Sequence, residues 1–188
     1  MRQAEIIKKM SDDELRRQLL LSQFILFLIS ILCSFFFFSH IRDWFQYFIF
    51  DMKQIFLYGI LTGTAIVIVE LILFLFIPER YFDDGGMNEK VFKNQSVVNI
   101  FIISIVVAIS EEFLFRGVLQ TTFGYIFASS LFVVLHFRYL KKPLLLILTM
   151  FVSFFIGYLF EITGNLLVTI AFHFIVDFLS GLAIRLKR

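Results

Sequence analysis

The feature that most constrains the fold is a succession of apolar runs, at residues 19–38, 55–77, 97–122, 125–140, 144–161 and 165–184. A helix needs about 20 apolar residues to cross a bilayer core of roughly 30 Å, so the fourth and fifth runs are short and are expected to tilt into the bundle. Hydrophobic residues make up 60% of the 188-residue chain, more than a soluble domain of this size can bury. We therefore predict an all-α fold, a polytopic integral membrane helical bundle of about six transmembrane helices.

Basic residues are distributed unevenly along the chain. If the N-terminus lies inside, all of the 17 Lys and Arg fall on inner segments except Arg42, Lys53 and the intramembrane Arg116. This bias predicts a multi-pass protein of the cell membrane with both termini in the cytoplasm. Residues 43–48 (DWFQYF) have the composition of an aromatic belt, so we expect them at the outer interface.

The longest polar break of the sequence lies at residues 83–86 (DDGG). It separates an N-terminal two-helix membrane region, residues 1–95, from a four-helix region, residues 96–188. Within the four-helix region we expect turns near Gly124 and Gly164, because glycine is common where helices end.

Several ionisable residues lie inside the apolar runs, where each costs roughly 3 kcal/mol to insert and is therefore a candidate for function. All but the first of them belong to the four-helix region. They are Glu70, Glu111, Glu112, Arg116, His136, His173 and Asp177.

The spacing of these residues predicts local pairs. Glu112 and Arg116 stand four apart with the acid first, the favourable order for a helical ion pair that braces the bundle. Glu111 projects about 100° away from Glu112, so it is left as a candidate general base. His173 and Asp177 share a helix face, and Asp177 could simply orient the imidazole.

Hairpin geometry brings residues of different runs to one depth. At 1.5 Å per residue, Glu111 and His136 lie roughly 18–20 Å from the outer turn between their two helices. His173 and Asp177 lie roughly 15–20 Å from the same side. Taken alone, either histidine is more often a hydrogen-bonded helix contact, but four ionisable groups on three helices at one depth predict a site.

Three motifs carry a family resemblance: E-E-x-x-x-R, F-x-x-x-H and H-x-x-x-N/D, in that order on successive helices. Here they stand as residues 111–116 (EEFLFR), 132–136 (FVVLH) and 173–177 (HFIVD). In apolar helices and in this order they resemble the CPBP family of CAAX proteases and bacteriocin-processing enzymes, also called Abi. The resemblance covers roughly residues 108–180 and makes residues 96–188 a CPBP-type (CAAX protease-like) catalytic core.

The resemblance implies an intramembrane endopeptidase that hydrolyses a peptide bond of a membrane-associated peptide or protein. Carried over to this sequence, Glu111 is the general base that activates water, with His136 as its partner. His173 and Asp177 form the oxyanion site.

Glu112 and Arg116 take supporting roles, either structural or in orienting the substrate.

Two departures from the family pattern qualify this transfer of roles. Asp177 stands where the best-studied members carry Asn, and an ionised Asp would repel an oxyanion, so it must be protonated or instead orient His173. The chain also has fewer spans than the eukaryotic CAAX proteases, which leaves substrate recognition open.

We expect no cofactor. Two His with Glu and Asp are also potential zinc ligands, but H-E-x-x-H is absent and the resemblance favours metal-free glutamate chemistry. The expected partners are a membrane-associated peptide or protein substrate and the lipid bilayer, with no nucleic acid. The oligomeric state and the identity of the substrate stay open.

Two other functions are compatible with the sequence. The first is a non-catalytic CPBP/Abi-type immunity or scaffold protein that binds a partner, a role that should survive replacement of Glu111 by alanine. The second is a proton-coupled transporter that uses Glu70, Glu111 and the histidines as a relay. No inverted repeat or pair of broken helices is visible, which disfavours the transporter.

Overall fold

The computed structural model describes residues 10–139 and 142–187, and over these ranges the chain is helical and contains no β-strand. Within the same ranges, five segments are long and apolar enough to cross a membrane: Asp12–Phe37, Met52–Phe76, Val97–Phe123, Pro143–Thr163 and Leu166–Leu186. The predicted all-α membrane bundle is confirmed.

Two of these segments change helix type along their length. The second consists of α3 (Met52–Gln54), the π-helix η2 (Ile55–Leu61) and α4 (Thr62–Phe76). The third consists of α6 (Val97–Glu112), the π-helix η4 (Phe113–Gln120) and α7 (Thr121–Phe123). The remaining elements are α2 (Asp12–Phe37), η1 (Ile41–Tyr47), η3 (Glu79–Tyr81), α5 (Met87–Phe92), α8 (Tyr125–Leu135), η5 (Phe137–Tyr139), α9 (Pro143–Thr163) and α10 (Leu166–Leu186).

The fourth apolar run forms a shorter helix than the sequence predicted. Helix α8 has 11 residues, so it extends over about 16 Å, half of a bilayer core. It ends because His136 leaves the helical conformation, with ψ at 38°. The fifth run is instead a full-length helix of 21 residues that begins at Pro143, a residue suited to a first helical position.

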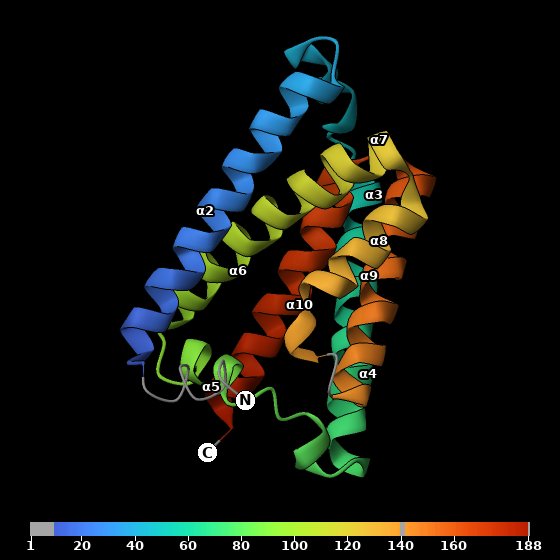
Figure 1. Ribbon diagram of the computed structural model, residues 1–188. Coiled ribbons are helices and arrows are strands. Elements are labelled where there is room, and N and C mark those ends of the chain that lie inside the picture. The colour runs from blue at the N-terminus through green and yellow to red at the C-terminus, as the bar shows by residue number, and fades with distance from the viewer. Residues whose placement is uncertain (1–9, 140–141, 188) are drawn as a thin grey trace.

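Helix α10 is the central element of the bundle. It packs against α6, against η2 and α4, and against α9. In Figure 1, α2 and α6 lie side by side on one side of α10, and α4, α8 and α9 lie on the other. The start of α2 and the end of α10 are at the same end of the bundle. The predicted turns are present, because Gly124 and Gly164 both have positive φ.

The aromatic segment after α2 contributes to the core. Trp44 in η1 is buried, although the composition of residues 43–48 suggested a belt at the lipid interface. Its ring stacks on Phe113 at 5.0 Å and meets Phe38 edge-on at 5.1 Å. The indole lies directly over Gly117, where a β-carbon would collide with it. A Trp can pack inside the bundle here because its neighbour has no side chain.

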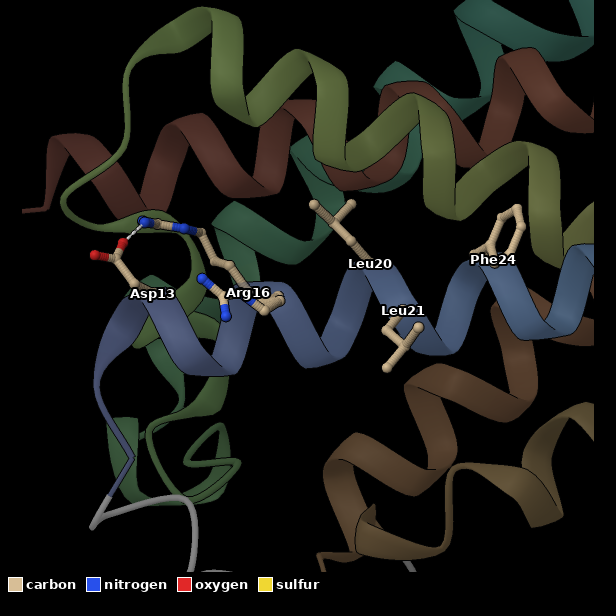
Figure 2. A pocket seen from close by; sticks show the side chains of 6 residues that line it. Asp13, Arg16, Leu20, Leu21 and Phe24 are labelled. Carbon is tan, nitrogen blue, oxygen red and sulfur yellow. Dashed lines mark hydrogen bonds and ion pairs between the residues drawn. The ribbon is translucent and has the colours of Figure 1, made fainter.

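Along one groove on the surface of α2, the side chains change from charged to apolar. Figure 2 shows Asp13 and Arg16, which are hydrogen-bonded to each other, at its first turns and Leu20, Leu21 and Phe24 further along. Such a step matches the boundary between headgroups and acyl chains. The residues of α2 beyond Leu20 are therefore at membrane depth.

Helices α8 and α9 approach closely at Gly157. A β-carbon added there would lie 2.6 Å from Ser129 Oγ and 2.8 Å from carbons of the Tyr125 ring. Both neighbours are hydrogen-bonded to α9, because Tyr125 Oη donates to Phe154 O at 2.9 Å and Ser129 Oγ donates to Ser153 O at 3.4 Å. Small residues commonly allow such contacts between membrane helices.

We expect Gly157→Leu to lower the free energy of unfolding by roughly 1–3 kcal/mol, because the added side chain overpacks this crossing. Thermal unfolding in detergent micelles measures the effect. The control is Tyr158→Leu, which introduces the same residue one position along at an exposed site. Equal unfolding temperatures for the two variants would contradict the predicted contact.

Candidate active site

The first motif stands at a change of helix type. Glu111 and Glu112 are the last residues of α6, and Arg116 lies in the π-helix η4. At the junction the backbone N–H of Phe113 is shared between two carbonyl oxygens of the preceding turn. The π-helical turns after this junction are wider than α-helical ones, and such segments are frequent at functional sites.

The predicted ion pair between Glu112 and Arg116 is present. Both side chains are completely buried, and Arg116 Nε lies 3.5 Å from Glu112 Oε2. The guanidinium also donates from Nη2 to Ser153 O on α9 at 2.8 Å and lies 5.1 Å from the centre of the Phe132 ring on α8. Arg116 thus links η4 to α9 and α8.

His173 is the residue on which the acidic side chains converge. Its Nδ1 lies 2.9 Å from Glu112 Oε1, a hydrogen bond between α10 and α6. Its Nε2 faces two further carboxylates, with Asp177 Oδ2 at 3.6 Å and Glu111 Oε2 at 3.9 Å. The sequence predicted the neighbourhood of His173 and Asp177. It did not predict that Glu112 bonds to the imidazole in addition to pairing with Arg116.

His136 lies at the edge of this cluster. Its ring stacks on Phe132 at 4.5 Å, and Phe132 in turn meets the His173 ring at 6.3 Å. Its Nδ1 lies 2.8 Å from Phe132 O, so Nδ1 carries a proton and donates to that carbonyl, and in the neutral form of the ring Nε2 is an acceptor. Among the described residues no hydrogen bond or ion pair joins His136 to Glu111.

Accessibility divides the cluster into two halves. The Glu112 and Arg116 side chains have no exposed surface, whereas the side chains of Glu111 and Asp177 are 12% and 30% exposed. Buried charges require partners, and the inner pair has them. The exposed surface of the cluster therefore belongs to Glu111, in small part, and to Asp177, and not to Glu112.

Gln23 on α2 is a member of the site that reasoning from the sequence missed. Its Nε2 donates to Glu111 Oε1 at 3.0 Å, and the side chain is buried. The signal in the sequence was a single amide within the first apolar run. The prediction of site residues rested on ionisable side chains, and an amide is not ionisable. Glu70 lies on α4 and accepts from Ser180 Oγ at 3.5 Å, one turn beyond Asp177 on α10.

The two halves of the cluster suit different kinds of chemistry. A carboxylate open to water beside an imidazole can accept a proton from that water. A neighbouring imidazole or imidazolium can stabilise negative charge. Within residues 10–139 and 142–187, no group of three or more His, Cys, Asp or Glu is arranged to hold a metal ion. Metal-free chemistry stays a prediction.

Comparison with known proteins supports the family resemblance that the three motifs indicate. Residues 93–179 match the family described as Type II CAAX prenyl endopeptidase Rce1-like. Uncharacterized protein YpbD of Bacillus subtilis (strain 168) is 35% identical over 167 residues, which cover 89% of this chain and 88% of the relative. No solved structure matches the chain.

The matched segment contains all three motifs and the residues that converge on His173, whereas Gln23 and Glu70 lie outside it. The likeness to YpbD extends over most of both chains. The chain therefore belongs to the Rce1-like family of type II CAAX prenyl endopeptidases, within the CPBP family.

Proposed function

We propose that this protein is an intramembrane endopeptidase that hydrolyses a peptide bond of a membrane-associated peptide or protein. The observation that carries the proposal is the placement of Glu111, a carboxylate at membrane depth that faces His173 Nε2 and keeps 12% of its side chain exposed. A carboxyl group with only a bracing role has no need of contact with water. Membership of a family of CAAX endopeptidases supports the same reaction class.

In the proposed mechanism Glu111 acts as the general base. It takes a proton from a water molecule as the water oxygen attacks the carbonyl carbon of the scissile bond. The tetrahedral intermediate then collapses, the C–N bond breaks, and the proton passes from Glu111 to the leaving amine. His136 assists Glu111 from the edge of the cluster, with its Nε2 free to bind the same water.

His173 and Asp177 are proposed to stabilise the oxyanion. Hydrogen-bond donors that are in place before the reaction stabilise developing charge most effectively. The bond from His173 Nδ1 to Glu112 fixes the orientation of the ring and leaves Nε2 toward the accessible half. Glu112 and Arg116 support this arrangement from the buried half.

The proposed location is the cell membrane, with both termini of the chain in the cytoplasm. The start of α2 and the end of α10 are at one end of the bundle, as this topology requires. The basic residues concentrate on the segments expected at that end.

Reporter fusions after Arg188 and within residues 78–96 should both report a cytoplasmic location. A fusion within residues 38–51, the segment between the first two spans, should report the opposite side. An outer location for either of the first two reporters would contradict the topology.

Replacing Glu111 by Gln keeps the size and polarity of the side chain but removes the base. Loss of general-base catalysis typically lowers a rate by about 10²–10⁴-fold, so we expect turnover close to background. The assay uses purified protein in vesicles and a cleavable membrane peptide, with rates normalised to folded protein. Glu89→Gln, the same change at an exposed site on α5, is the control and should leave turnover unchanged. A protein that acts only by binding a partner would show no turnover to lose, and an active Glu111→Gln enzyme would refute the mechanism.

The change Asp177→Asn decides between two roles of this residue. If residue 177 contacts the oxyanion, Asn can donate a hydrogen bond without needing a proton, so activity should persist or rise. If Asp177 acts as a carboxylate that orients His173, the same change should reduce turnover by roughly tenfold or more. Because the proposed mechanism places residue 177 at the oxyanion and its side chain is 30% exposed, we expect turnover to persist. Turnover at neutral pH, compared with the wild-type protein, is the measurement.

A further inference from the structure

We propose that Gln23 is a positioning residue for Glu111, whose amide engages one carboxylate oxygen and leaves the other to take the proton from water. This inference rests on the proposed function, because it assigns Gln23 to the same reaction. Gln23 belongs to α2, outside the segment that matches the family of endopeptidases.

The position of Gln23 is fixed by packing on both sides. Helix α2 packs against α6 and η4, the two elements that carry the first motif. Leu26, one turn further along α2, contacts the buried cluster of Leu114, Phe115 and Phe132 beneath the site. Gln23 lies seven residues beyond Arg16, the arginine at the charged end of the groove in Figure 2, and is therefore about 10 Å deeper in the membrane.

The hydrogen bond to Glu111 determines how the amide is oriented. A carboxylate only accepts, so the Nε2 of Gln23 must face it, and Nε2 lies 3.0 Å from Glu111 Oε1. The amide oxygen therefore points away from the carboxylate. This Oε1 is buried and has no hydrogen-bond partner among the described residues.

The amide oxygen has no partner among the described residues and its burial is unfavourable, so the bond from Nε2 to Glu111 is what holds the amide in this orientation. Glu111 Oε1 is engaged by Gln23, which leaves Oε2, 3.9 Å from His173 Nε2, to take the proton. The bond from Gln23 thus determines which carboxylate oxygen acts as the base.

This assignment explains why an amide occurs in the first apolar run. An unpaired polar side chain on a lipid-facing helix would be unfavourable, and hydrogen bonds between membrane helices occur where a partner is present. Gln18, by contrast, is exposed near the start of the same helix and contributes nothing to the site.

The test compares Gln23→Met and Gln23→Glu with Gln18→Met, the same change at the exposed position on α2. Met keeps the length of the side chain without hydrogen bonds, and Glu keeps its shape without a donor. Hydrogen bonds to charged groups correspond to roughly ten- to hundredfold in a rate. We expect kcat to fall by that factor in both Gln23 variants, with KM unchanged and kcat of Gln18→Met unaltered.

A role confined to docking α2 would lower the unfolding temperature and leave kcat per folded molecule unchanged, since positioning of the base is what kcat reports. If Gln23→Met does not fold, the Gln23→Glu variant decides alone. A kcat within about twofold of wild type, or a change in KM without one in kcat, would overturn the inference. Wild-type protein that cleaves nothing, or a Glu111→Gln variant that stays active, would instead overturn the proposed function and this inference with it.

Discussion

The arrangement of the C-terminal helices depends on the burial of the Arg116 guanidinium. A charge at membrane depth is tolerated only with partners, and removing a partner from a buried pair typically costs about 3–5 kcal/mol. The partners of Arg116 come from its own segment through Glu112, from α9 through Ser153 O, and from α8 through the Phe132 ring. Because Glu112 also bonds to His173, α10 is part of the same network. Several elements therefore meet at one side chain.

The charges of this network do not balance within the cluster. Three carboxyl groups, those of Glu111, Glu112 and Asp177, lie within 4.0 Å of one imidazole, and among the described residues Arg116 is the only other base that forms an ion pair with them. Even with His173 protonated, one negative charge is in excess when all three acids are ionised. Glu112 is neutralised by Arg116 in the buried half, so the excess falls on the accessible half. The buried half of the cluster is therefore compensated, and the uncompensated charge belongs to the half formed by Glu111 and Asp177.

The three motifs and their helical spacing made much of the site predictable. The features that were missed depend on local backbone conformation and on contacts between distant segments. The pairs Glu112–Arg116 and His173–Asp177 followed from helical spacing, and both are present. Hairpin geometry also placed His173 near Glu111, because straight helices of known rise fix depth. It did not reveal that α8 ends at Leu135, since the apolar composition of the run continues past His136. Gln23 was missed because its partner lies 88 residues away, and long-range contacts leave no periodic trace. The burial of Trp44 depends on the absence of a side chain at Gly117, in a distant segment.

The π-helical segment, whose composition is not distinctive, bears on how the chain length can vary. A π-helix takes up more residues in each turn than an α-helix, so residues 113–120 behave as an α-helix that has gained a residue. Because the wider turns absorb that residue, a chain with one residue fewer here can wind as an α-helix and still present the helix beyond it on the same face. The missing residue must not be one whose contact the bundle needs, since Gly117 lies under Trp44 and Gln120 donates to Gly157 O. A single-residue alignment gap in this stretch therefore separates proteins that differ in helix type but share the same helix faces.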